Sequence, residues 1–250
     1  MKTAIITGAS SGLGKEFVRQ IHDVFPQIEE YWLIARREDH LQALSVPGVV
    51  LRVLPLDLTS DAYLSRLQEE LSAQKPDVQL LINCAGCGYL GNFHESALQE
   101  QCRMLDLNIR ALSCVTHAVL PFMAEGGRIL NISSIASFVP NVRMTVYSAT
   151  KAYVSFFSRG LHEELKPRRI SVTAVCPGPM DTEFIQTGRI KGYSKTFDTL
   201  PYCIPHKVVR GALKAAKKRR AVYTPKFFYK LYRVLSGLIP HAILLHLAKT

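Results

Sequence analysis

The sequence lacks any uninterrupted run of about 20 apolar residues, the length that a helix needs to cross a bilayer. Its first residues, MKTAIITG, contain only a short apolar run, whereas a secretory signal needs a longer apolar core and a small-residue cleavage site. We therefore expect a cytoplasmic protein without a membrane span. Hydrophobic residues make up 48% of the chain and charged residues 20%, which is typical of a folded globular protein.

Cysteine is also sparse, with six among 250 residues, and a chain that is not exported should keep them reduced. Cys84 and Cys87 form a C-x-x-C pair. Neither a second cysteine pair nor a nearby histidine pair completes a zinc site. We expect no metal centre and interpret the two cysteines as small side chains at a strand end and in the turn after it.

Acidic residues are missing from the last part of the chain. The formal net charge is +11. Residues 207–250 contain eleven lysines and arginines and no aspartate or glutamate, so the excess charge is confined to this segment. Such an asymmetry suggests a binding partner. Nucleic acid is not expected, because no nucleic-acid-binding motif accompanies the charge.

Short β-branched runs alternate with helical patterns. We predict strands at 3–7, 31–35, 49–56, 78–83, 128–133, 170–176 and 221–224, and helices at 12–25, 61–74, 97–123 and 146–165. Repeated strand–helix–strand units give parallel strands joined by right-handed crossovers, and strands that are apolar throughout are covered on both faces. We see no linker and no internal repeat, so the fold class is α/β: one doubly wound Rossmann-type domain with a central parallel sheet flanked by helices.

A glycine-rich turn, TGASSGLG, lies between the first predicted strand and the first predicted helix. Gly8 lets the chain turn sharply, Gly12 lets the backbone approach a pyrophosphate, and Gly14 lets the helix pack closely on the strand. The helix start offers N–H groups and a positive dipole end to phosphates. Ser10 and Ser11 add hydroxyl groups. The turn therefore predicts a dinucleotide site.

Arg36 and Arg37 directly follow the second predicted strand, in LIARRE. A carboxylate at this place binds the adenosine ribose and favours NAD, whereas an arginine suits the 2′-phosphate of NADP. Two arginines on a loop are often only solvated. Their position at this strand end nevertheless predicts NADP(H) as the cofactor.

Tyr147 and Lys151, in YSATK, are four residues apart and therefore share one face of a predicted helix. An ammonium group within about 4–6 Å of a phenol lowers the phenol's pKa from its usual value of about 10. Such a phenol can act as a general acid or base. On its own, the pair would also fit an exposed Tyr–Lys contact on a helix surface.

Taken together, the motifs resemble the short-chain dehydrogenase/reductase family. TGASSGLG, NCAG at 83–86, YSATK and the Pro-Gly pair at 177–178 have that family's order and spacing over about residues 1–225. The resemblance implies a dinucleotide-binding and catalytic domain at 1–225, and residues 226–250 would extend it. One departure is Cys84, which replaces the second asparagine of the usual N-N-A-G.

The resemblance also implies roles for individual residues. Tyr147 would be the general acid or base, and Lys151 would tune it and bind the nicotinamide ribose. Ser134, rather than its neighbour Ser133, would orient the substrate oxygen, and Asn108 would hold a water in a proton relay. The implied cofactor-binding set is Gly8, Ser10, Ser11, Gly12, Leu13, Gly14, Arg36, Arg37, Asp57, Leu58, Asn83, Ala85, Gly86, Tyr147, Lys151, Pro177, Gly178, Met180 and Thr182.

The substrate is not encoded in these motifs. In the family it is selected by segments that here span 88–95, 135–145 and 180–205, and these segments supply Tyr89, Phe93, Phe138, Val139, Met144, Phe184, Ile185, Phe197 and Tyr202. Their apolar character favours a small lipophilic ketone, aldehyde or alcohol over a sugar. The alternative is a nucleotide-binding or sensing protein that has lost turnover, although such relatives usually lack the tyrosine or the lysine.

The last 25 residues combine basic charge with an apolar stripe. Lys226, Lys230 and Arg233 are interleaved with Phe227, Leu231, Val234, Leu235 and Leu238. A basic amphipathic helix of this kind predicts peripheral contact with an anionic membrane. The alternatives are a lid on the substrate cleft and a subunit interface in a homodimer or homotetramer.

Overall fold

The computed structural model describes residues 1–188, 190, 198–240 and 243–244. Its centre is a sheet of seven parallel strands in the order β3-β2-β1-β4-β5-β6-β7. The strands are β1 (Lys2–Thr7), β2 (Glu30–Ala35), β3 (Val50–Pro55), β4 (Asp77–Asn83), β5 (Met123–Ile132), β6 (Ser171–Val175) and β7 (Val222–Tyr223).

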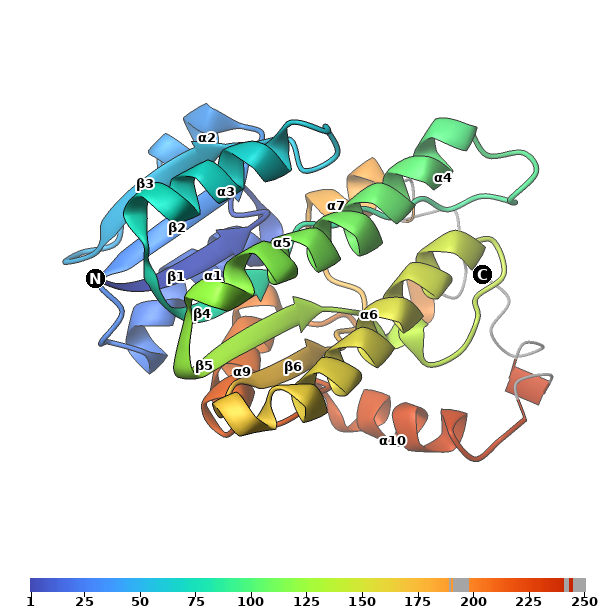
Figure 1. The fold of residues 1–250 in the computed structure, drawn as a ribbon. Coiled ribbons are helices and arrows are strands. Elements are labelled where there is room, and N and C mark those ends of the chain that lie inside the picture. The colour runs from blue at the N-terminus through green and yellow to red at the C-terminus, as the bar shows by residue number, and fades with distance from the viewer. Residues whose placement is uncertain (189, 191–197, 241–242, 245–250) are drawn as a thin grey trace.

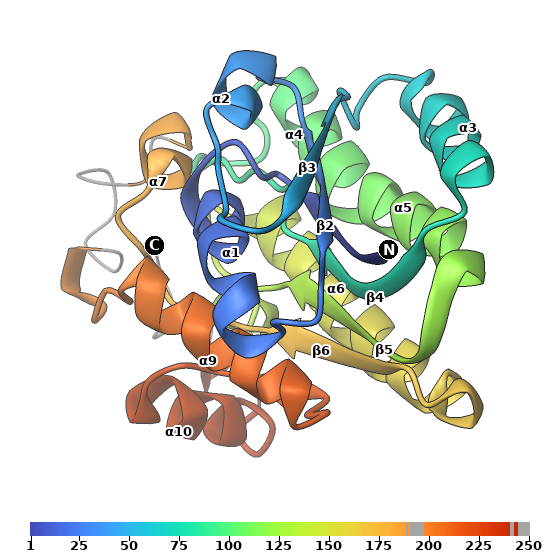
Figure 2. The ribbon, with the colours of Figure 1, turned by 90° about the vertical axis from the view of Figure 1, so that its left-hand side faces the viewer.

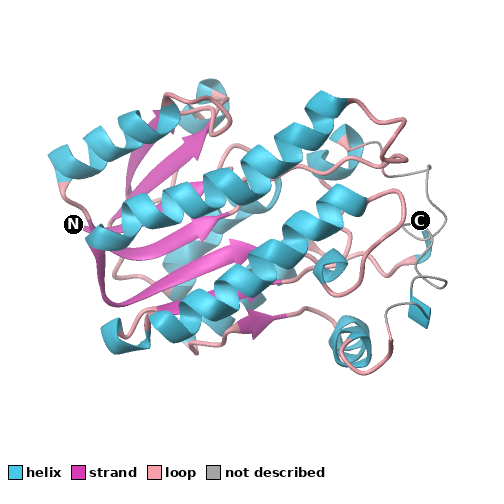
Figure 3. Cartoon of the chain, turned by 45° about the vertical axis from the view of Figure 1, so that its right-hand side comes forward, coloured by secondary structure: helices cyan, strands magenta, loops and turns pink. Residues whose placement is uncertain are grey.

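Helices cover both faces of this sheet (Figure 1). The described helices are α1 (Gly12–Val24), α2 (Glu38–Gln42), α3 (Tyr63–Gln74), α4 (Leu98–Leu105), α5 (Leu112–Val119), α6 (Thr145–Glu164), α7 (Glu183–Thr187), α9 (Pro205–Lys217) and α10 (Phe227–Ser236). Figure 2 shows α1 and α9 side by side on one face, and Figure 3 shows the layered arrangement of helices and parallel strands. The predicted doubly wound α/β fold is confirmed.

Both faces of the sheet are apolar because successive strand residues point to opposite sides. Ile6 of β1 packs in one fully buried cluster with Phe17 of α1 and Leu213 of α9. Its neighbour Ile5 packs in the other cluster, with Leu67 of α3. The strand order reverses at β1, between β2 and β4, which is where doubly wound folds bind ligands beyond the carboxyl ends of the strands.

The single helix predicted over 97–123 is wrong in detail. The chain forms α4, then a π-helical segment over Asp106–Ala111, then α5 and a short 3-10 turn over Leu120–Phe122. The π segment contains Asn108, whose side-chain amide bonds to a neighbouring loop and to α6 rather than to its own helix. A one-residue expansion of the helical turn is common near functional groups.

The strand predicted at 128–133 begins earlier, at Met123. Gly126 and Gly127, which follow the helix predicted over 97–123, lie inside β5. Gly126 adopts φ +79°, and a Cβ at Gly127 would lie 2.7 Å from Met123 Cε and 2.9 Å from the carbonyl oxygen of Ala124. The glycine pair therefore forms an irregularity within the strand, where the register with β4 shifts.

The predicted apolar stripe of the C-terminal segment lies on the opposite side from the core. In α10, Tyr229 is the fully buried side chain, and its hydroxyl donates a hydrogen bond to the carbonyl oxygen of Pro201 at 2.8 Å. Leu231, Val234 and Leu238 are exposed. Helix α10 lies at the edge of the molecule (Figures 1 and 2).

Candidate active site

A cavity of about 880 Å³ lies at the carboxyl ends of the central strands, beneath α7 and α10. It collects side chains from segments that are far apart in the sequence, because every parallel strand ends at the same edge of the sheet. The predicted site residues that line it are Gly8, Ser10, Ser11, Gly12, Leu13, Gly14, Arg36, Arg37, Asp57, Leu58, Ala85, Gly86, Ser134, Tyr147, Lys151, Pro177, Gly178, Met180 and Thr182. Asn83 and Asn108 are not part of the lining.

The glycine-rich turn forms one wall of the cavity. A Cβ at Gly14 would lie 2.0 Å from the carbonyl oxygen of Gly8, so the close packing of α1 on this turn requires glycine. Gly12 adopts φ +49°, and the nearest atoms to a Cβ there belong to Thr182, at 3.8 Å or more. Ser11 occupies the N-cap of α1 without a side-chain capping bond. The start of α1 lines the cavity, in the position that a phosphate-binding helix start would take.

The side chain of Arg37 connects two segments of this wall. Its Nη2 donates to Ser10 Oγ at 3.4 Å and to Glu183 Oε2 at 2.9 Å. Glu183 is the first residue of α7, so the ion pair connects the end of β2 to the segment that follows β6. The hydrogen bond from Arg37 lowers the pKa of the Glu183 carboxyl group. The guanidinium group of Arg37, which was predicted to bind a 2′-phosphate, is thus paired with the carboxylate of Glu183.

Asp57, two residues after the end of β3, is held in a local turn. Partial burial raises its pKa, but two hydrogen bonds from Thr59 to Oδ1, at 3.0 Å from the amide and 2.7 Å from the hydroxyl, and the nearby charge of Arg36 lower it overall. Asp57 is therefore ionised and accepting bonds at the edge of the cavity. Arg36 is exposed beside it.

The side chain of Asn83 has a role in the fold. Its Nδ2 donates to Thr116 Oγ1 at 2.9 Å and to Asn131 Oδ1 at 2.8 Å, which ties β4 to α5 and β5. The turn after it is held by Thr7, whose hydroxyl oxygen accepts from the amides of Cys84 and Ala85 at 3.0 and 3.1 Å. Those two backbone bonds hold the turn even though Cys84 replaces an asparagine. The pKa of the Cys84 thiol is raised to about 12 by burial, so the thiol is neutral.

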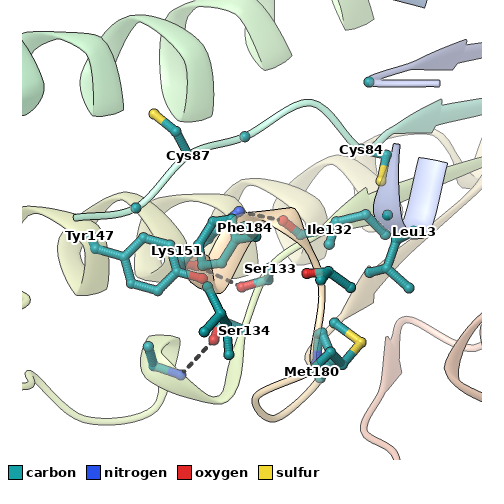
Figure 4. A pocket seen from close by; sticks show the side chains of 18 of the residues that line it. Leu13, Cys84, Cys87, Ile132, Ser133, Ser134, Tyr147, Lys151, Met180 and Phe184 are labelled. Carbon is teal, nitrogen blue, oxygen red and sulfur yellow. Dashed lines mark hydrogen bonds between the residues drawn. The ribbon is translucent and has the colours of Figure 1, made fainter. Parts of the chain in front are cut away.

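Ser134 and Tyr147 face each other inside the cavity (Figure 4). Their side chains are hydrogen-bonded, and Ser134 Oγ also accepts from the amide of Ala136 at 3.1 Å. Ser133 points elsewhere: its Oγ donates to the carbonyl oxygen of Lys151 at 2.8 Å and bonds to Ser155. The two adjacent serines therefore have different partners, and Ser134 is the one bonded to Tyr147.

The charge relationship between Tyr147 and Lys151 differs from the expectation. Burial raises the pKa of Tyr147 to about 12 and lowers that of Lys151 to about 8. Lys151 Nζ lies 5.7 Å from the centre of the Tyr147 ring and donates to the carbonyl oxygen of Ile132 at 2.8 Å. In the protein alone, desolvation therefore outweighs the attraction that would lower the phenol's pKa.

Asn108 lies behind the lysine rather than in the cavity. Its Oδ1 accepts from the amide of Cys87 at 2.9 Å, and its Nδ2 donates to the carbonyl oxygen of Cys87 at 2.8 Å and to Thr150 Oγ1 at 3.0 Å. A Cβ at Gly86 would lie 3.1 Å from Asn108 Oδ1 and 3.4 Å from Lys151 Nζ. Asn108 therefore positions the loop and the helix that carry the lysine.

Part of the predicted substrate-selecting set lines the cavity, namely Tyr89, Met144, Phe184 and Ile185. The Phe184 ring lies 5.7 Å from that of Tyr147. Phe93 is exposed, and Phe138, Val139 and Tyr202 are not part of the lining. Phe197 falls outside the described residues.

The C-terminal segment contributes to this cavity, which the sequence raised only as the alternative of a lid, without identifying the residues involved. The lining also contains Phe228, Tyr229, Tyr232, Leu235, Ile239 and Leu244. Tyr229 packs so closely on the loop after β6 that a Cβ at Gly178 would lie 2.3 Å from its ring. The spacing of Tyr229 and Tyr232, one helical turn apart on the side away from the predicted stripe, was the available signal.

Comparison with known proteins gives three informative likenesses. The model of the short chain dehydrogenase family matches residues 2–191. Serine 3-dehydrogenase of Agrobacterium fabrum is 32% identical over 195 residues, which cover 74% of this chain and 76% of that protein. A short-chain dehydrogenase from Sphingobium yanoikuyae, solved in complex with NADPH, is 31% identical and covers 95% of both chains with a TM-score of 0.79.

A further solved structure bears on substrate size. The bulky-bulky ketone specific alcohol dehydrogenase from Comamonas testosteroni is 30% identical, with a TM-score of 0.75, over 95% of this chain and 93% of its own. The preference for bulky ketones is a property of the Comamonas enzyme.

Proposed function

This chain belongs to the short-chain dehydrogenase family and is an oxidoreductase of that family, and from that premise we propose that it uses NADP(H) to interconvert a lipophilic ketone or aldehyde and the corresponding alcohol. The observation that carries the proposal is the grouping of Ser134, Tyr147 and Lys151 in the same cavity as the glycine-rich turn. Residues 1–225 would contain both the cofactor site and the catalytic groups.

The cavity wall fits a dinucleotide phosphate. The open space beside Gly12 and the uncapped start of α1 suit the pyrophosphate, and a side chain on Gly8 or Gly14 would collide with backbone. Arg36 and Arg37 suit a 2′-phosphate, because arginine forms short charge-assisted hydrogen bonds to phosphate. The NADPH complex of the Sphingobium relative supports this choice over NAD(H).

The described side chains suggest how a proton would move. When bound, the nicotinamide supplies or accepts the hydride. Tyr147 holds a proton on its phenol at neutral pH, because burial keeps its pKa near 12, and can give it to a substrate oxygen that gains negative charge. Ser134, hydrogen-bonded to Tyr147, would donate to the same oxygen and orient it. Lys151 would hold the ribose and draw the phenol proton towards release.

A lipophilic substrate is supported by the lining around Tyr147. Met144, Phe184 and Ile185 lie on one side of the cavity, and Tyr232 and Leu235 contribute to its wall from α10. The likeness to a bulky-ketone dehydrogenase supports the same class. The likeness to a serine dehydrogenase points to a polar substrate instead, which the apolar lining disfavours.

The test is a panel of aliphatic, aromatic and polycyclic ketones and alcohols, with L-serine included, assayed with NADPH and NADP⁺ in parallel with NADH and NAD⁺. We expect turnover of bulky apolar carbonyls with NADPH. Turnover of serine alone, or a preference for NADH, would contradict the proposal. A cofactor-binding protein without any turnover would be the catalytically silent alternative.

The expected assembly and location also remain proposals. We propose a homodimer or homotetramer in the cytoplasm, to be checked by light scattering on the purified full-length chain.

A further inference from the structure

Helix α10 has two unlike faces. Its inner face is fixed by Tyr229, which is fully buried and hydrogen-bonded to Pro201. Its outer face is apolar and exposed: the exposed fractions are 79% for Phe227, 47% for Leu231, 53% for Val234 and 76% for Leu238. Contiguous exposed apolar side chains of this size mark an interaction surface. We call these four residues the outer face of α10.

Basic side chains border the outer face. Lys226, the residue before α10, and Lys230 within it are both exposed and directly precede Phe227 and Leu231 in the sequence. The sequence contains no aspartate or glutamate beyond Asp198. An apolar surface bordered by positive charge alone is complementary to a partner that is apolar inside and anionic at its boundary.

A second copy of the chain is a poorer occupant than a bilayer. A two-fold contact through this helix would place its basic residues against a helix that is also basic, because α10 carries no carboxylate to pair with them. Like charges held opposite each other disfavour such a contact. Among the described helices none is long and apolar enough to span a bilayer, so α10 would lie along the surface.

We propose that the outer face of α10 docks on the headgroup region of an anionic bilayer, with Lys226 and Lys230 against the lipid phosphates and carboxylates. Phe228 and Leu235 line the cavity and are also partly exposed, so they join the docked surface to the substrate cavity. A lipophilic carbonyl dissolved in the bilayer would reach Tyr147 along α10. This second step rests on the proposed function, whereas the docking itself does not.

The docking test uses the full-length chain without cofactor or substrate. The protein is sedimented with vesicles of phosphatidylcholine alone and with vesicles that also contain phosphatidylserine. We expect binding to the anionic vesicles that weakens as salt rises, because surface charge is screened over about 8 Å at physiological ionic strength. No binding to anionic vesicles, or equal binding to both kinds, overturns the proposal.

Two variants locate the surface. Phe227→Ser/Leu231→Ser/Leu238→Ser removes outer-face side chains that do not line the cavity, and Lys226→Gln/Lys230→Gln removes two charges. Each charge near such a surface is worth roughly a fivefold change in binding, so the second variant should lose at least tenfold. The matched control is Phe156→Ser/Arg159→Gln, which changes an exposed phenylalanine and an exposed arginine on α6.

Wild-type vesicle binding by the outer-face variant would overturn the proposal, as would an equal loss in the α6 control. A change in oligomeric state by light scattering, without vesicle binding by the wild type, would assign the face to a second copy. Circular dichroism and thermal melting show whether each variant is folded.

The entry step is measured with vesicles present. The outer-face variant should raise KM for a ketone that partitions into lipid by about tenfold and leave kinetics with a short water-soluble ketone unchanged. Unchanged KM for the lipid-dissolved ketone would refute entry from the bilayer. A protein that binds vesicles but turns over nothing would refute the proposed function and leave the docking intact.

Discussion

Lys151 Nζ lies 5.7 Å from the centre of the Tyr147 ring but donates its hydrogen bond to the carbonyl oxygen of Ile132, at 2.8 Å. Both groups are buried, and burial disfavours the charged form of each. The phenol therefore keeps its proton, and the ammonium group is close to losing one. A phenol that keeps its proton at neutral pH suits carbonyl reduction, in which the substrate oxygen must receive a proton.

Tyr147→Phe should remove turnover and leave cofactor binding nearly intact, because only the hydroxyl group is lost. General acid catalysis contributes roughly 10²–10⁴-fold, so the rate should fall by at least about a hundredfold. Turnover is measured with the best ketone of the panel, and NADPH binding by fluorescence. Tyr153→Phe, whose hydroxyl bonds to Ser113 on the exposed side of α6, is the control. A variant with a tenth or more of the wild-type rate would show that another group supplies the proton.

The buried Lys151 should give the protein's stability a specific pH dependence. Its pKa is about 8 when folded and 10.5 when unfolded, so between these values the unfolded chain binds more protons at this site. The free energy of unfolding therefore increases as pH rises through that window. Below about pH 8 the folded protein carries the full free-energy cost of burying the charged lysine.

The measurement compares the free energy of unfolding by urea of wild type and Lys151→Met from pH 7.5 to 9.5. The difference should shift in favour of the wild type as pH rises, by about 2 kcal/mol between pH 7.5 and 9.5. Other titrating groups, such as the buried thiols, occur in both proteins and largely cancel. A difference that stays flat would mean that Lys151 keeps its proton in the folded protein.

The part of the site that could be predicted from the sequence is the part set by local geometry. The turn around Gly8 and the Tyr147–Lys151 pair are short motifs whose spacing determines their shape. The choice of Ser134 over Ser133 came from the spacing of the family that the sequence resembles, because both serines lie beyond the end of β5. Helix α9 was not predicted, although Pro205 at its first position and its buried Val209 and Leu213 fit a helix.

The orientation of α10 could not be predicted in this way. The periodicity shows an apolar stripe that includes Leu231 and Leu238, and an apolar stripe usually packs inward. In the structure Tyr229 takes the inward position, because its ring fits against Gly178 and its hydroxyl reaches Pro201. Which face of α10 packs inward therefore depends on the shape of the loops that contain Gly178 and Pro201, far away in the sequence. The pKa of Tyr147 likewise depends on burial, which the sequence spacing does not contain.

Arg36→Ala and Arg37→Ala should each raise KM for NADPH far more than KM for NADH, because only NADPH carries the 2′-phosphate. The loss of a charge-assisted hydrogen bond costs roughly 1.5–3 kcal/mol, equivalent to about ten- to a hundredfold in KM. Steady-state kinetics with both cofactors measure the effect, and NADH is the internal control. Equal effects on the two cofactors would show that the arginines do not bind the phosphate.

Glu183→Gln should have the opposite effect on NADPH. Its carboxylate accepts a hydrogen bond from Arg37 at 2.9 Å, so a bound phosphate would have to compete with it. Both side chains are partly exposed, and such pairs are worth about 0–1 kcal/mol. NADPH should therefore bind up to about fivefold more tightly, by calorimetry of the cofactor-free protein, with NADH unchanged. Weaker NADPH binding would mean that Glu183 supports the phosphate site.

Substitutions on the two faces of α10 should have very different effects on stability. Tyr229→Ala removes a fully buried aromatic ring, which typically costs about 3–5 kcal/mol, whereas Tyr229→Phe removes one hydrogen bond, worth about 0.5–1.5 kcal/mol. Phe227→Ala, on the exposed face, should change stability by no more than about 0.5 kcal/mol. Urea unfolding in the absence of lipid measures all three. Because Tyr229 also lines the cavity, Tyr229→Ala should raise KM for bulky ketones, and Phe227→Ala should not. If Phe227→Ala destabilised the protein as much as Tyr229→Ala, α10 would pack with its other face inward, and the outer face would not be available to a bilayer.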